Sequence, residues 1–74
     1  MILIFSRHAK MRLRERKISK SSVKKAILNF NRIVNLGDNK FMCYYKINGF
    51  NLVVVFAKQK DITKVITTYY ENNL

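Results

Sequence analysis

The chain has 74 residues, of which 49% are hydrophobic, and its 15 Lys and Arg against 4 Asp and Glu give a formal net charge of +11. This length allows one small domain with a thin core, and the hydrophobic fraction is too high for a disordered polycation. One His, one Cys and a few scattered acids do not supply the ligands of a protein metal site, so we expect no metal and no cofactor. A strongly basic domain is expected to bind an anionic partner.

The single cysteine, Cys43, excludes an internal disulfide and favours a reducing compartment, so we expect a cytoplasmic protein. The apolar residues 1–5 are too short for a signal peptide, and no apolar run reaches the length that spans a membrane. We therefore predict a single domain over residues 1–74 that does not bind membranes.

The first half of the chain is predicted to be helical. Ser6 is placed to cap a helix that runs from Arg7 to about Lys17. Ser19 is placed to cap a second helix, in which apolar residues recur at helical spacing. This second helix is expected to end between residues 29 and 32.

The second half of the chain is predicted to form strands, because its hydrophobic residues alternate with a period of two. Asn48-Gly49 predicts a tight hairpin, since both residues tolerate positive φ, and a second turn is predicted at 37–39. The predicted strands cover residues 32–36, 41–47, 52–57 and 62–70. We predict an α+β fold in which two N-terminal helices cover one face of a four-stranded antiparallel sheet, to which residues 1–5 can add a short edge strand.

The first predicted helix carries cations beside its apolar stripe. At about 100° per residue, His8, Arg12 and Arg16 form one ridge at positions i, i+4 and i+8. Arginine is rarely buried without an anionic partner. Two interpretations are open. Either the arginines pack their stems on the sheet and pair with Glu15, Asp38 or carbonyl oxygens, or they converge on one phosphate group.

His8 is the candidate general base. It lies in the first turn of the helix close to Arg12, and both positive surroundings favour the neutral imidazole, which can accept a proton. A neutral base beside cations suits the attack of a ribose 2′-hydroxyl on the neighbouring phosphate. The alternative is a surface or capping histidine, which is the commoner role of a lone His.

The string at residues 8–16, His-Ala-Lys-Met-Arg-Leu-Arg-Glu-Arg, resembles the motif His-Ala-x-x-Arg-[Met/Leu]-x-x-Arg that opens a small family of domains of unknown function. The resemblance continues through Ile18-Ser19 and the second helix. It resumes at residues 66–69, Ile-Thr-Thr-Tyr, which are similar to the Ile-Thr-x-Tyr ending of that family. The family is grouped with RelE-like and BrnT-like toxins in the barnase–EndoU–colicin–RelE superfamily of metal-independent ribonucleases.

The resemblance implies a RelE-like endoribonuclease, the toxin of a toxin–antitoxin pair, that cleaves RNA by 2′-hydroxyl attack without a metal. By the matched positions, His8 would be the base, Arg12 and Arg16 would hold the phosphate, and Thr67 would orient the site. Tyr69 is a weaker catalytic candidate. The resemblance also implies an acidic antitoxin that covers a groove between the first helix and the last strands. From the strand alone, Thr67 is an ordinary β-branched residue that shares a face with Tyr69.

Further residues are candidates for RNA binding. Lys46, Lys58 and Lys64 are placed to extend a track of phosphate contacts, although sheets also use such lysines for solubility. Only one tyrosine of each adjacent pair, at 44–45 and at 69–70, can face a groove and stack on unpaired bases. The competing interpretation is a non-catalytic basic module that binds RNA or DNA, and net charge does not separate it from a nuclease.

Overall fold

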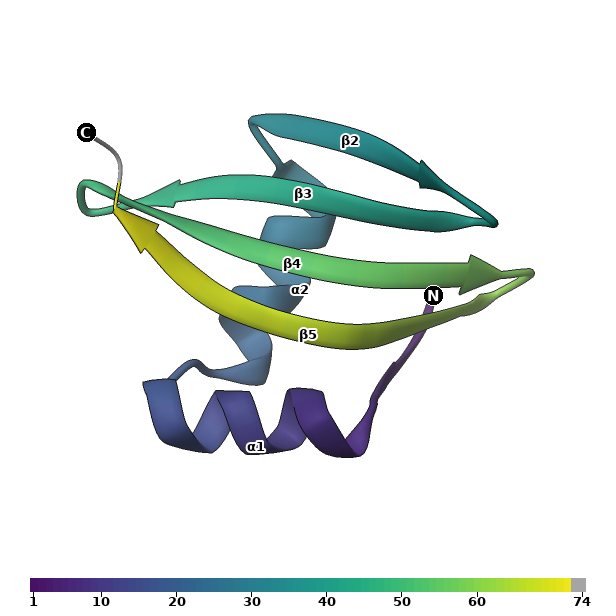
Figure 1. Cartoon of the computed structure of the whole chain (residues 1–74), viewed down its shortest axis with the longest axis horizontal. Helices are drawn as coiled ribbons and strands as arrows, with labels where there is room; N and C mark the ends of the chain where they lie inside the picture. The colour runs from purple at the N-terminus through teal and green to yellow at the C-terminus, as the bar shows by residue number, and fades with distance from the viewer. Residues whose placement is uncertain (73–74) are drawn as a thin grey trace.

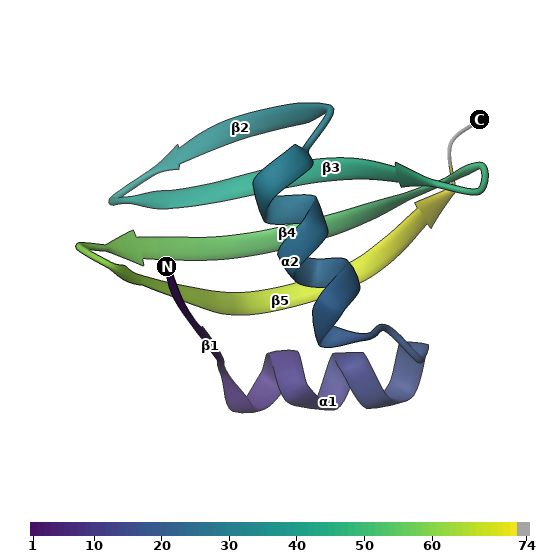
Figure 2. The same ribbon diagram turned by 180° about the vertical axis from the view of Figure 1, so that it is seen from behind.

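The computed structural model describes residues 1–72 and shows two helices packed on a five-stranded sheet. Figure 1 looks onto the sheet face that α2 leaves uncovered, and Figure 2 shows α2 crossing the other face. The predicted α+β fold is confirmed, and the N-terminal strand brings the strand count to five. The elements are β1 (Ile2–Phe5), α1 (Arg7–Arg16), α2 (Lys20–Asn29), β2 (Arg32–Gly37), β3 (Lys40–Ile47), β4 (Phe50–Gln59) and β5 (Ile62–Asn72).

Both helices begin at the predicted serine caps. The hydroxyl oxygen of Ser6 accepts a hydrogen bond from the Ala9 backbone N–H at 3.0 Å, and Ser19 accepts one from the Ser22 N–H at 3.0 Å. α1 ends at Lys17, whose φ of 54° is left-handed and turns the chain toward α2. Neither helix within residues 1–72 is long and apolar enough to cross a membrane.

The sheet order is β1-β5-β4-β3-β2. The last four strands form the predicted antiparallel meander, with β4, whose residues 52–57 carry no charge, inside the sheet. The β3–β4 turn has positive φ at both Asn48 and Gly49, as the tight-hairpin prediction requires. β1 pairs in parallel with the first half of β5. Both helices and three strands separate the two in sequence, and they supply the long connection that parallel strands need.

The hydrophobic core lies between the helices and one face of the sheet. Residues on β3 and β4 alternate between this face and the opposite one, which we call the open face. Leu52, Val54 and Phe56 point toward the helices and are buried there. The core cluster also includes Ala9, Leu13, Ile18, Val23, Ala26, Ile27, Cys43 and Val65.

A β-bulge in β5 changes which residues face the core. Phe56 of β4 pairs with Val65, but the preceding Val55 pairs with Thr67, so Ile66 is an extra residue. Val65 belongs to the core, and Thr67 lies on the open face with Val55. The bulge thus directs Thr67, and Tyr69 after it, to the side of the sheet that no helix covers.

Candidate functional site

The start of α1 is attached to β5 at the bulge. The Ser6 backbone N–H donates to the Val65 carbonyl oxygen at 2.9 Å, and the Ser6 hydroxyl donates to the Ile66 carbonyl oxygen at 2.8 Å. The same hydroxyl caps α1, so one side chain joins the helix to the strand. His8 follows two residues after Ser6, and Thr67 follows directly after Ile66. The first turn of α1 therefore lies beside the part of β5 that carries Thr67.

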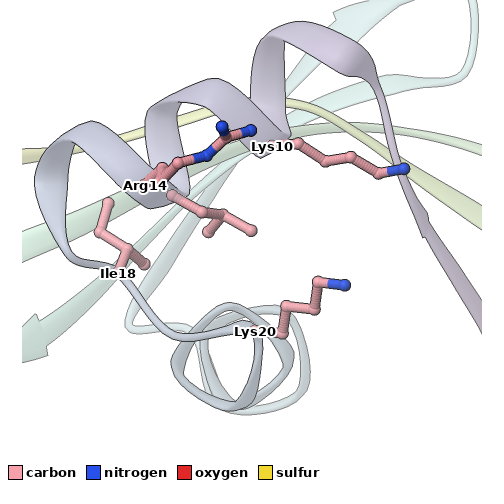
Figure 3. A pocket seen from close by; sticks show the side chains of 5 residues that line it. Lys10, Arg14, Ile18 and Lys20 are labelled. Carbon is pink, nitrogen blue, oxygen red and sulfur yellow. The ribbon is translucent and has the colours of Figure 1, made fainter.

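The two flanks of α1 face different sides of the molecule. A cavity of about 360 Å³ lies between α1 and α2, and Figure 3 shows Lys10 and Arg14 of α1 and Lys20 of α2 around it, with Ile18 at its edge. Lys10 and Arg14 therefore mark the flank of α1 that faces α2.

His8 and Arg12 lie on the other flank. Successive helical residues are about 100° apart around the helix axis. The buried residues Ala9 and Leu13 are each followed by a cation that lines the cavity, Lys10 or Arg14. His8 and Arg12 come directly before the same buried residues, so they lie about 100° to the opposite side. His8 and Arg12 therefore point away from α2, toward the open-face side of β5. We call this side of α1 the outer flank.

Arg16 lies further from the predicted partners. It is exposed in the last turn of α1, where Figure 1 shows β5 curving away from the helix. Arg16 therefore continues the ridge of His8 and Arg12 to the exposed end of α1. The arrangement brings His8, Arg12 and Thr67 onto neighbouring elements and leaves Arg16 one turn beyond them.

Arg12 has an internal partner. Its Nη1 lies 3.0 Å from Oε1 of Glu15, and this is the only salt bridge found within residues 1–72. The two side chains are 35% and 50% exposed, so the pair is solvated and is worth about 0.2–1 kcal/mol. A phosphate group can replace a carboxylate held this weakly. Of the predicted partners of the arginines, Glu15 is the one observed, and it binds Arg12.

The structure separates the tyrosines of each adjacent pair. Tyr44 and Tyr69 lie on the open face, where both are cross-strand neighbours of Val53. Tyr45 packs against the core, and Tyr70 also lies on the helix side of the sheet. Burial raises the pKa of Tyr69, with smaller contributions from Tyr44 and Glu71, so its hydroxyl remains a proton donor above the usual range.

The predicted lysines do not share one surface. Lys46 and Lys64 lie on the open face, opposite Asn51 and Ala57 of β4. Lys58 lies on the helix side, where it lines a small apolar cavity with Phe56 and with Ile27 of α2. Lys58 is therefore separated from the open face by the sheet itself.

Sequence reasoning missed Arg32. Its guanidinium lies over the Tyr44 ring, 4.9 Å from the ring centroid, a cation–π contact on the open face. Counting outward from the turn at residues 37–39 predicts the partner of Arg32 only if β2 and β3 pair without a shift. The register shifts between Asn35 and Gly37, so this counting does not pair Arg32 with Tyr44.

Cys43 is a core residue. It is completely buried, and its thiol donates to the Ala26 carbonyl oxygen at 3.7 Å. Burial raises the pKa of the Cys43 thiol from 9.0 to about 11. In the part of the chain that the structure describes, no three His, Cys, Asp or Glu side chains are grouped to hold a metal ion.

Comparison with known proteins identifies one family. Residues 5–70 match the family described as a domain of unknown function, DUF4258, and this segment includes both helices and most of the sheet. It also contains His8, Arg12, Arg16, Thr67 and Tyr69. No curated protein and no solved structure matches the chain. The chain belongs to the DUF4258 family of domains of unknown function.

Proposed function

We propose that this protein is a metal-independent, RelE-like endoribonuclease and the toxin of a toxin–antitoxin pair. The observation that carries the proposal is the position of His8 and Arg12 on the outer flank of α1, beside the segment of β5 that carries Thr67. The likeness of residues 8–16 and 66–69 to the motifs of a family that is grouped with RelE-like and BrnT-like toxins supports the same assignment.

In the proposed reaction the ribose 2′-oxygen attacks the adjacent phosphorus, and the 2′-hydroxyl proton passes to His8. Arg12 donates hydrogen bonds to the phosphorane oxygens as their negative charge develops. The bond between phosphorus and the 5′-oxygen breaks, and that oxygen takes a proton from Tyr69 or from water. The products are a 2′,3′-cyclic phosphate and a 5′-hydroxyl. Thr67 orients the phosphate or the imidazole through its hydroxyl.

Two further roles belong to this proposal. Arg16 binds a phosphate one step away from the scissile one, since it lies a helical turn beyond Arg12. The antitoxin is an acidic protein that covers the outer flank of α1 and the neighbouring part of β5 when no RNA is bound. The net charge of +11 favours such a partner through electrostatic complementarity.

The test compares variants of α1 on one RNA in the presence of EDTA. His8→Ala is expected to lower the cleavage rate about 10²- to 10⁴-fold, the contribution of a general base. Affinity for a cleavage-resistant 2′-O-methyl RNA is expected to stay unchanged in this variant. Arg12→Ala is expected to lower cleavage about 10²- to 10³-fold, as the loss of one oxyanion donor does.

Arg7→Ala is the matched control, since it removes the same charge from the same helix at an exposed position away from the outer flank. It is expected to leave the cleavage rate within about threefold of wild type, a loss that salt screening reduces further. Equal losses for Arg7→Ala and Arg12→Ala would contradict a phosphate site on the outer flank and would point to a general charge effect.

The second candidate function is a non-catalytic RNA- or DNA-binding module. The observation in its favour is the salt bridge between Glu15 and Arg12, which neutralises the cation that the reaction needs. Such a module would leave RNA intact in every buffer, and its affinity would fall linearly with salt on logarithmic axes. Removing Arg12 would then only reduce the slope of that line.

A further inference from the structure

Val53 shows that side chains cover the centre of the open face. This residue points away from the helices, yet its exposed fraction is 0%. Its direct cross-strand neighbours are Tyr44 on β3 and Tyr69 on β5. Because no helix lies on this side of the sheet, these neighbouring side chains bury Val53 (Figure 1). Tyr44 and Tyr69 therefore flank β4 at this point of the open face.

The two tyrosines form a surface and not a slot. Each is only partly buried, so part of each ring is accessible, and the Arg32 guanidinium lies over one face of the Tyr44 ring. The Tyr44 hydroxyl donates to Sδ of Met42 at 3.1 Å, which holds the ring along its own strand. The raised pKa of Tyr69, to which Tyr44 contributes, agrees with two rings near each other. We call this surface the tyrosine platform.

Cations border the tyrosine platform. Arg32 on neighbouring β2 lies over the Tyr44 ring, and Lys46 is two residues from Tyr44 along β3. Lys40 and Lys64 lie further along the same face, on either side of Ala57. Among residues 1–72, Glu71 is the acidic residue that pairs across strands on the open face. An apolar aromatic centre with a positive border fits an anionic chain that carries flat bases.

The spacing of the platform determines which nucleic acid fits it. The backbones at Tyr44 and Tyr69 are separated by two strand spacings, about 9.5 Å, so the two rings start from well-separated positions. Stacked bases in a nucleic-acid helix follow one another at about 3.4 Å. Two bases that each lie on one of these rings must therefore be separated from each other. A paired helix does not release its bases in this way, whereas an unpaired strand does.

We propose that the open face binds an unpaired RNA strand, with separate bases stacked on Tyr44 and Tyr69 and phosphates held by Arg32 and Lys46. This rests on the proposed function for the identity of RNA as the ligand, and it adds that the substrate is single-stranded. A second copy of this chain is disfavoured on the same face because two molecules of charge +11 repel each other. An acidic partner helix would use the cations but has no need of two exposed aromatic rings.

The test measures binding with a 2′-O-methyl oligouridylate of ten nucleotides, which cannot be cleaved, and with the same strand annealed to its complement. Fluorescence anisotropy at low and at moderate salt gives the dissociation constants. Wild-type protein is expected to bind the single strand at least tenfold more tightly than the duplex. Tyr44→Leu and Tyr69→Leu are each expected to weaken single-strand binding about 5- to 150-fold, the loss of one stacked base.

The controls separate stacking from stability and from catalysis. Tyr70→Leu removes an adjacent, exposed tyrosine on the helix side and is expected to leave the affinity within twofold. Tyr69→Phe keeps the ring, so it is expected to bind the single strand like wild type, and a fall in its cleavage rate would identify the Tyr69 hydroxyl as the proton donor. Circular dichroism checks that each leucine variant is folded, and a variant that is not folded is replaced by the corresponding isoleucine variant, which also lacks a ring and favours strands.

Three outcomes would overturn the proposal. The first is equal affinity for single strand and duplex, and the second is unchanged single-strand affinity in folded Tyr44→Leu and Tyr69→Leu proteins. The third is binding of poly-glutamate, or a dimer in sedimentation, that Tyr44→Leu abolishes while RNA binding stays intact. This would assign the face to an acidic partner or a second copy. The 2′-O-methyl strand cannot be cleaved, so this assay measures binding alone. If the nuclease proposal is wrong but the platform is right, wild-type protein will bind the single strand and will cleave no RNA.

Discussion

Replacing Ser6 by alanine should destabilise the protein more than any ordinary loss of a helix cap. The Ser6 hydroxyl accepts from the Ala9 N–H and also donates to the Ile66 carbonyl oxygen, so one substitution removes two hydrogen bonds. The cap is worth typically about 1 kcal/mol, and a further hydrogen bond to the sheet contributes about 0.5–1.5 kcal/mol. We expect Ser6→Ala to lower the free energy of unfolding by about 2 kcal/mol.

Ser19→Ala is the matched control, because Ser19 caps α2 at the same bond length but its hydroxyl has only the neighbouring Ser22 as a further partner. We expect it to cost about 1 kcal/mol. Urea unfolding gives both values, and thermal melts should show Ser6→Ala unfolding about 8–16 °C below wild type. Equal losses for Ser6→Ala and Ser19→Ala would refute the inference that Ser6 attaches α1 to β5.

Three other predictions concern charge, backbone and pH. Glu15→Gln should free Arg12 and tighten RNA binding at low salt more than the equal charge change Asp61→Asn does, with less than about 0.5 kcal/mol change in stability. An unchanged affinity would show that Glu15 does not compete with RNA. Gly49→Ala should cost about 1–2 kcal/mol in urea unfolding from its φ of 85° alone, since no atom lies within 4 Å of the added methyl group, and a neutral result would contradict the positive-φ turn. The contribution of the buried Cys43 thiol to the free energy of unfolding is fully present below pH 9.0. About 2–3 kcal/mol of it should be lost as the pH rises to about 11, because the thiol of the unfolded chain ionises first. The free energy of unfolding of Cys43→Ala should not show this pH dependence.

Local patterns in the sequence predict most of the fold. The capping serines, the change of hydrophobic period after residue 31 and the Asn48-Gly49 turn each depend on neighbouring residues only, and the structure agrees with all of them. The pairing of β1 with β5 was not predictable in the same way. It joins segments about sixty residues apart, and a short apolar strand contains no information on its partner or direction.

The candidate site depends on a feature that alternation alone gets wrong. A regular strand would put Val65, Thr67 and Tyr69 on one face, and the burial of Val65 would then place the other two in the core. The extra residue Ile66 reverses the order after Val65, so Thr67 and Tyr69 reach the open face. Their shared face was predictable, but the side of the sheet was not, because no residue type marks a bulge of this kind.

In the proposed reaction the outer flank of α1, with His8 and Arg12, acts on a phosphodiester through the neighbouring 2′-hydroxyl. Mass spectrometry of a short RNA incubated with wild-type protein in EDTA tests it most directly, when a second RNA carries one 2′-deoxynucleotide at the cleaved position. We expect fragments that end in 2′,3′-cyclic phosphate from the first RNA and no cut at that linkage in the second. Intact RNA, or fragments from the deoxy-substituted linkage, would contradict the claim.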